Sequence, residues 1–100
     1  MKNVRLSQEE IDIIKSTAEE IFGKDIEVYI FGSRADLNKK GGDIDIYIEC
    51  PMEVSLAEKL KFLAKLELRG IERKVDLVIK TPKSLQKPIF EEARQKGVKL

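Results

Sequence analysis

The sequence predicts a small α/β domain in which helices cover a mixed sheet of about three to four strands. The chain has 100 residues, a length at which a single hydrophobic core forms readily. Of these residues 42% are hydrophobic and 37% are charged, which excludes a disordered or collagen-like chain. Segments with helical periodicity alternate with short β-branched runs, the order expected when helices pack on a sheet. We therefore expect one domain, residues 1–100.

Two segments, 7–23 and 55–70, are predicted to form amphipathic helices. Each opens with a serine, Ser7 or Ser55, and has a glutamate three residues later, which is the pattern of a capping box. Apolar residues then recur at helical spacing until a glycine ends each segment. Pro88, followed by acidic and then by basic residues, predicts a short final helix whose dipole is complemented by these charges.

Three runs rich in β-branched and aromatic residues, 26–31, 43–49 and 75–79, are predicted to be strands. The second run has the clearest alternation of apolar and polar residues. Because successive side chains of a strand point to opposite faces, these two kinds of residue separate onto two faces of the sheet. One face carries Ile44, Ile46 and Ile48, and the other carries Asp43, Asp45, Tyr47 and Glu49.

The low net charge of the chain argues against a protein that binds nucleic acid through a large overall positive charge. There are 19 Lys and Arg against 18 Asp and Glu, a net charge of +1, so direct nucleic-acid binding is not expected. The first 50 residues hold 7 basic and 11 acidic residues, net −4, and the last 50 hold 12 and 7, net +5. Such segregation most often reflects which helix faces meet solvent, and it can also steer a partner to one face.

The cysteine and histidine content restricts the metal chemistry. Cys50 is the single cysteine and there is no histidine, which excludes an internal disulfide and a zinc site of Cys and His ligands. The N-terminus lacks the apolar core of a signal peptide, and no apolar run reaches the length of a membrane span. We expect a reduced, cytoplasmic protein that does not bind membranes.

Gly32 and Ser33 directly follow the first predicted strand and are the first candidate for ligand binding. A glycine at this position lets the backbone approach a ligand closely, and the serine hydroxyl and the next free N–H groups can hold a phosphate. An ordinary turn with a serine cap has the same sequence, so this feature alone favours the structural explanation.

Three aspartates are the second candidate. Asp43 and Asp45 share one strand face about 6.6 to 7 Å apart, a spacing from which carboxylates can converge on Mg²⁺, although any half-buried strand can carry acids on its wet face. Asp76 interrupts an apolar strand, where an ionised carboxylate needs a metal or a cationic partner. The structural alternatives for Asp76 are an ion pair with Arg73 or Lys74, or exposure on an edge strand.

In combination, a phosphate cradle, two acids on the next strand and a third acid on a later strand are what metal-dependent nucleotidyl transfer requires. The string FGSRA over 31–35, followed by GGDIDI over 41–46, resembles the signature of the polymerase-beta-type nucleotidyltransferases. The chain is most similar in kind to the minimal nucleotidyltransferases of prokaryotes, single-domain proteins often encoded beside a HEPN-domain partner. The resemblance covers nearly the whole chain and implies the polymerase beta-like nucleotidyltransferase fold.

The resemblance also implies a role for each motif residue. Three acids would be catalytic and would hold two Mg²⁺ ions, the last of them also being the candidate base: Asp43, Asp45 and Asp76. Three residues of the turn would hold the phosphates of ATP: Gly32, Ser33 and Arg34.

The activity implied by the resemblance is Mg²⁺-dependent transfer of AMP from ATP to a hydroxyl of a partner protein. The partner would be a HEPN-family toxin, which makes this chain the antitoxin, and the basic second half is a candidate docking face. Three alternatives stay open: neutralisation of the partner by binding without catalysis, a small-molecule adenylyltransferase of the aminoglycoside type, and an inactive structural domain. The second is disfavoured by the lack of an acceptor-binding domain, and the third by the intact set of motif residues.

Overall fold

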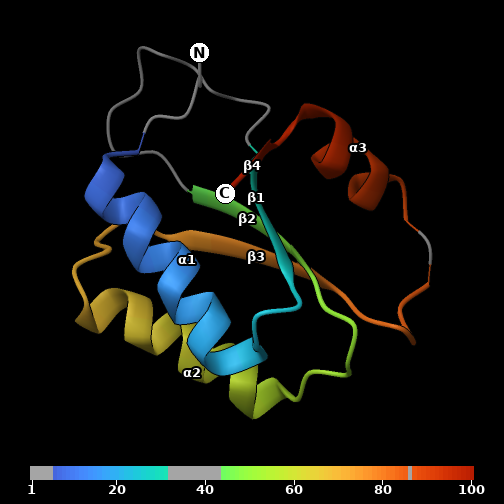
Figure 1. Cartoon of the computed structure of the whole chain (residues 1–100), viewed down its shortest axis with the longest axis horizontal. Coiled ribbons are helices and arrows are strands. Elements are labelled where there is room, and N and C mark those ends of the chain that lie inside the picture. The colour runs from blue at the N-terminus through green and yellow to red at the C-terminus, as the bar shows by residue number, and fades with distance from the viewer. Residues whose placement is uncertain (1–5, 32–43, 86) are drawn as a thin grey trace.

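The computed structural model describes residues 6–31, 44–85 and 87–100, and these residues form a sheet with helices on both faces (Figure 1). The elements follow the predicted order, with one further strand at the C-terminus. They are α1 (Gln8–Phe22), β1 (Glu27–Phe31), β2 (Ile44–Glu49), α2 (Leu56–Leu68), β3 (Val75–Lys80), α3 (Pro88–Lys96) and β4 (Val98–Lys99). None of the helices in this part of the chain is long and apolar enough to cross a membrane.

Both predicted capping boxes are confirmed. At the start of α1 the Ser7 hydroxyl accepts a hydrogen bond from the Glu10 backbone N–H (3.1 Å), and the Ser7 N–H donates to the Glu10 carboxylate (3.0 Å). Ser55 and Glu58 form the same pair of bonds at the start of α2. These bonds satisfy N–H groups that have no partner within the helix, and they fix where each helix begins.

The sheet is mixed, with strand order β3-β2-β1-β4. β1 pairs antiparallel with both β2 and β4, whereas β2 and β3 are parallel and are connected through α2. Two consecutive strands can be parallel only if a crossover connection joins them, and α2 is that connection. The four strands agree with the predicted sheet of three to four strands. β4 has only two residues, too few to show the alternation by which the other strands were predicted.

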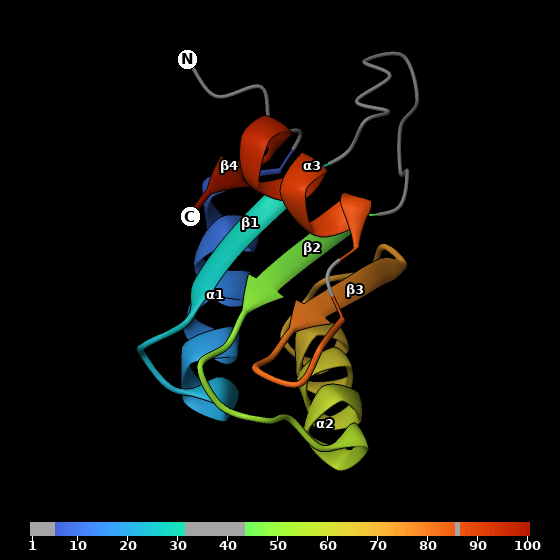
Figure 2. The ribbon, with the colours of Figure 1, turned by 90° about the vertical axis from the view of Figure 1, so that its right-hand side faces the viewer.

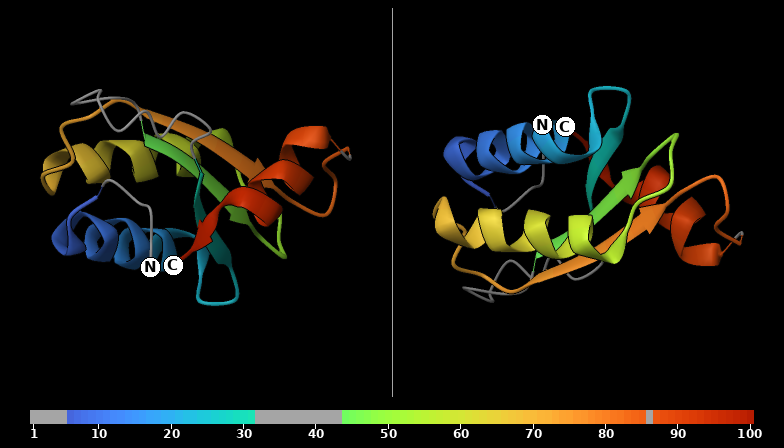
Figure 3. Two further views of the ribbon diagram at one scale, coloured as in Figure 1. Left: turned by 90° about the horizontal axis from the view of Figure 1, so that it is seen from above. Right: turned by 90° about the horizontal axis from the view of Figure 1, so that it is seen from below.

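The two faces of the sheet are covered to different extents. α1 and α2 lie side by side on one face, and α3 lies on the other (Figures 2 and 3). The isoleucines of β2 face α1 and α2, where the rings of Phe22 and Phe62 pack with their centroids 5.4 Å apart. On the opposite face Tyr47 is fully buried against Phe90 of α3. The polar face of β2 is therefore only partly exposed to solvent.

Candidate functional site

Two of the six residues predicted for the site lie in the described part of the chain, Asp45 on β2 and Asp76 on β3. The other four lie outside the described residues: Gly32, Ser33, Arg34 and Asp43. The described part of the site therefore consists of the two acids and the strands around them.

The two acids are direct partners in the parallel ladder of β2 and β3, where Asp45 pairs with Asp76. Neighbouring strands lie about 4.8 Å apart, so the two Cα atoms are separated by roughly that distance. Directly paired residues project to the same face, and for these two it is the face of Tyr47, since the flanking isoleucines of β2 point to α1 and α2. The parallel register thus brings together two carboxylates that are 31 positions apart in the sequence.

The strands also direct the segment between β1 and β2 to this end of the sheet. Phe31, the last residue of β1, is the antiparallel partner of Asp45. Ile44, the first residue of β2, is paired with Val75. The chain therefore leaves and re-enters the sheet beside the two acids, and Phe31, which directly precedes the predicted phosphate-binding residues, pairs with Asp45.

The two acids differ in exposure. Asp45 is half-buried, because β2 lies between β1 and β3, whereas Asp76 is exposed on β3, the outer strand of the described sheet. Within the described residues neither Arg73 nor Lys74 forms an ion pair with Asp76. Of the two structural alternatives for Asp76, the structure therefore agrees with exposure on an outer strand rather than with an ion pair. The same exposure leaves this carboxylate accessible to a ligand.

Paired carboxylates at this spacing fit a hard cation. Like charges placed directly opposite each other in a sheet are destabilising, and a cation between them removes the repulsion. Mg²⁺ is usually bound by one or two carboxylates together with waters and phosphate oxygens. Within residues 6–31, 44–85 and 87–100, no cluster of three or more His, Cys, Asp or Glu residues could hold a metal. Asp45 and Asp76 would be two of the three predicted ligands, and the other, Asp43, lies outside the described residues.

A family model described as a nucleotidyltransferase domain matches residues 11–96, from within α1 to the last residue of α3. The chain belongs to this family. Its three helices and mixed sheet agree with the polymerase beta-like nucleotidyltransferase fold, and its general chemistry is nucleotidyl transfer. No curated protein matches the chain.

A second polar cluster of the nucleotidyltransferase lies at the opposite end of the same sheet face. The Tyr47 hydroxyl donates to Glu49 Oε2 (2.7 Å), and Arg94 of α3 is ion-paired with the same oxygen (3.1 Å). Similarly, the Tyr29 hydroxyl donates to Glu27 Oε1 (3.0 Å). Burial, and then the hydrogen bond to Glu49, raise the pKa of Tyr47. The alternation along β2 correctly predicts the face of Tyr47 and Glu49, but Arg94 is too distant in sequence for its pairing with Glu49 to be recognised.

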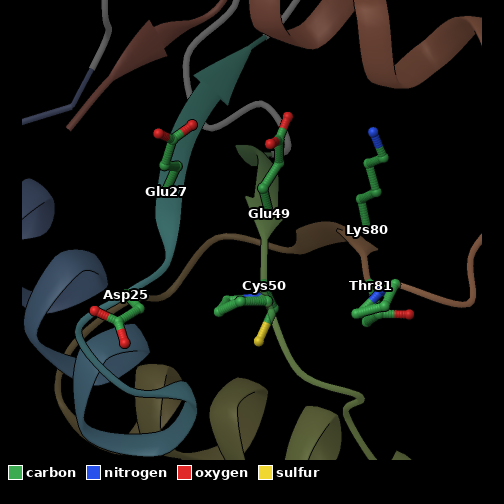
Figure 4. Close-up of a pocket in the computed structure, with 8 residues that line it drawn as sticks. Asp25, Glu27, Glu49, Cys50, Lys80 and Thr81 are labelled. Carbon is green, nitrogen blue, oxygen red and sulfur yellow. The ribbon is translucent and has the colours of Figure 1, made fainter.

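This second end also contains a hollow of about 330 Å³ (Figure 4). Glu27, Glu49 and Lys80 point to the same side of the sheet at its border. Glu49 is four residues beyond Asp45 on β2, about 13 Å along the strand, so the hollow is separate from the two acids. Its lining consists of Asp25, Glu27, Glu49, Cys50, Pro51, Lys80, Thr81 and Pro82.

Proposed function

We propose that this nucleotidyltransferase moves AMP from ATP to a hydroxyl group, with Mg²⁺ as cofactor and pyrophosphate as the leaving group. The observation that carries the proposal is the pairing of Asp45 with Asp76 across β2 and β3. Two carboxylates on adjacent strand positions favour cation binding, and Phe31, which directly precedes the predicted phosphate-binding residues, pairs with Asp45. Bound Mg²⁺ would neutralise charge on the triphosphate and polarise the α-phosphate.

The two acids are suited to different parts of the reaction. Asp45 is half-buried between Phe31 and Asp76, so its carboxylate is held in a fixed position and serves as a metal ligand. Asp76 is exposed, so an acceptor from outside can reach it. The acceptor oxygen attacks the α-phosphorus, the bond from that phosphorus to pyrophosphate breaks, and Asp76 takes the hydroxyl proton.

The acceptor in this proposal is a hydroxyl of a partner protein, a tyrosine of a HEPN-family toxin that AMP transfer switches off. Two observations support a macromolecular acceptor. Asp76 is exposed on the α3 face of the sheet, from which a second protein has access to it. The hollow beside Cys50 is about 13 Å from the acids by strand length, which is too far to hold a small acceptor for the reaction. The HEPN identity rests on the sequence resemblance.

The proposal is tested by incubating the chain with the HEPN protein of the adjacent reading frame, ATP and Mg²⁺, and weighing that protein by intact-mass spectrometry. We expect a mass gain of one or more AMP units with the wild type and none with Asp45→Asn or Asp76→Asn. Glu49→Gln is the matched control, because Glu49 is on the same face of β2 but outside the predicted site. A modified RNA or small molecule beside an unmodified partner would overturn the choice of acceptor.

The same variants distinguish catalysis from neutralisation by binding. In cells that express the toxin, Asp45→Asn and Asp76→Asn should lose protection while still copurifying with it. Full protection by the double variant would show instead that binding is sufficient and that transfer is dispensable.

A further inference from the structure

The outer edge of β3 is open in the described structure. β3 has six residues and pairs only with β2 among the described strands. The carbonyls of Lys74 and Lys80 accept hydrogen bonds from the β2 side, from Ile44 N–H and Cys50 N–H (both 2.9 Å). Backbone groups alternate in direction along a strand, so those of the odd-numbered residues 75, 77 and 79 point outward. Such an edge can pair with another strand.

The helix beneath this edge exposes large apolar side chains on its outer side. α2 lies on the β3 side of the sheet and α1 on the β1 side (Figures 2 and 3). Lys65 and Arg69 bind Glu20 and so mark the side of α2 that faces α1. Leu56 lies nine positions before Lys65, and Leu60 lies nine positions before Arg69. Nine residues make 2.5 helical turns, so the two leucines project to the side of α2 that faces away from α1. They are 70% and 57% exposed.

We propose that this surface joins two copies of the chain around a two-fold axis. In this dimer the β3 strands pair antiparallel, and Leu56 and Leu60 of each α2 pack against the other α2. Such an interface is isologous, because each copy contributes the same surface. It gives the β3 edge a partner strand and removes the exposed leucines from water. The dimer does not depend on the proposed AMP transfer.

Charge complementarity selects the register of the two β3 strands. With the axis at Val78, Asp76 of each copy lies opposite Lys80 of the other on the α3 face, and Leu77 lies opposite Ile79 on the α2 face. Leu77 and Ile79 are among the residues whose backbone groups point outward, so they can exchange hydrogen bonds across the axis. The two ion pairs stabilise this arrangement, as opposite charges do when they are cross-strand neighbours.

The neighbouring registers are less favourable. An axis at Ile79 places Asp76 opposite Pro82 and Lys80 opposite Val78, so neither charge is paired. Two other registers bring like charges together. An axis at Leu77 places Lys74 opposite Lys80, and an axis at Asp76 places the two Asp76 carboxylates opposite each other. Both arrangements are disfavoured by repulsion. In the selected register the Lys80 ammonium of the second copy lies beside Asp76, at the border of the acid pair.

The leucine contact is tested by sedimentation equilibrium over a range of micromolar concentrations. The wild type should approach twice the chain mass of 11.4 kDa, and Leu60→Glu should weaken dimerisation at least tenfold. Leu68→Glu is the matched control: Leu68 is on the same helix and 84% exposed, but is three residues from Lys65 and so near the α1 side. A wild type that stays monomeric at high micromolar concentration, or equal effects of the two variants, would overturn the proposal.

The register is tested by exchanging charges. Asp76→Lys and Lys80→Asp each place like charges at both ends of the pairing, so each variant alone should be monomeric. An equimolar mixture restores opposite charges at both positions and should form a heterodimer, detectable by native mass spectrometry. Circular dichroism confirms that the single variants are folded. If the mixture does not associate while both variants are folded, this pairing is wrong. Because the readout is mass, the result is independent of whether the chain transfers AMP.

Discussion

The two ends of the polar sheet face use carboxylates in different ways. At the far end, Glu49 accepts from Tyr47 and pairs with Arg94, while Glu27 accepts from Tyr29. At the near end, the register pairs one carboxylate, Asp45, with another. At the far end each carboxylate is thus paired with donors and cations, whereas at the near end the register places two carboxylates side by side.

This contrast separates structural acids from acids suited to binding. Charge-assisted hydrogen bonds hold Glu49 between β2 and α3, so that this carboxylate helps to fix the helix on the sheet. Two adjacent carboxylates do not stabilise the fold by themselves, but they lower the free energy of a bound cation. The register thus places two acids together at one end of β2, where the proposed cation would bind.

The largest effect is expected at the near end. Asp45→Asn or Asp76→Asn should lower AMP transfer about 1000-fold, since a metal ion contributes several kcal/mol to charge stabilisation in the transition state. Mn²⁺ binding followed by electron paramagnetic resonance should weaken in parallel, which tests the site without an acceptor. The free energy of unfolding of the Asp76→Asn variant should change by less than about 0.5 kcal/mol, because Asp76 is exposed.

Glu49→Gln sharpens this comparison. It should leave Mn²⁺ binding and transfer unchanged and should lower the unfolding free energy, because the charge that pairs with Arg94 is lost. If instead Asp76→Asn destabilised the fold as much as Glu49→Gln does, the two ends would not differ in the way described.

The next largest effect is expected where α3 packs on the sheet. Phe90 is 3% exposed and stacks on Tyr47 with ring centroids 5.8 Å apart. Phe90→Ala should lower the unfolding free energy by about 3 to 5 kcal/mol in urea titrations, because it leaves a cavity between helix and sheet. Leu85→Ala is the control, since Leu85 is 79% exposed and should change stability by less than about 0.5 kcal/mol. An effect as small for Phe90→Ala would mean that α3 is not held by this contact.

A smaller effect is expected from the hydroxyl of Tyr47. Tyr47→Phe keeps the ring stacking but leaves Glu49 Oε2 without the hydrogen bond at 2.7 Å. Bonds to charged groups contribute about 1.5 to 3 kcal/mol, so a loss near the lower value is expected while Arg94 still pairs with the carboxylate. Chemical unfolding with and without Arg94→Ala measures the coupling; additive effects of the two changes would show that the network does not act as a unit.

The sequence was most informative where the structure depends on local contacts. Ser7 and Ser55 cap helices by bonds to residues three positions away, so both helix starts could be predicted. Sheet order depends on which strands meet in three dimensions, and for that reason the sequence left exposure of Asp76 on an edge strand as one of several alternatives. The pairing of Asp45 with Asp76 also needs the parallel register. The acids were recognised from their motif, but their contact follows only from the fold.

The smallest effect should be the acid dependence of the far end. The hydrogen bond from Tyr29, and then the charge of Lys99, lower the pKa of Glu27 below its ordinary value of 4.5. A depressed pKa in the folded state means that this stabilisation is present above pH 4.5 and is lost as the pH falls through the folded value.

The stability difference between wild type and Glu27→Gln should therefore be largest at neutral pH and should shrink below pH 4.5. Glu20 provides the reference, because Lys65 and Arg69 lower its pKa to about 2. The contribution of Glu20 to the stability of the fold should therefore persist to lower pH than that of a carboxyl with a pKa near 4.5. Both carboxylates are exposed, so water screens these interactions and the shifts in thermal midpoint should be small. Thermal unfolding followed by circular dichroism at a series of pH values measures them. A difference that grew on acidification would mean that Glu27 is not stabilised as a carboxylate, and that the far end does not compensate its charges.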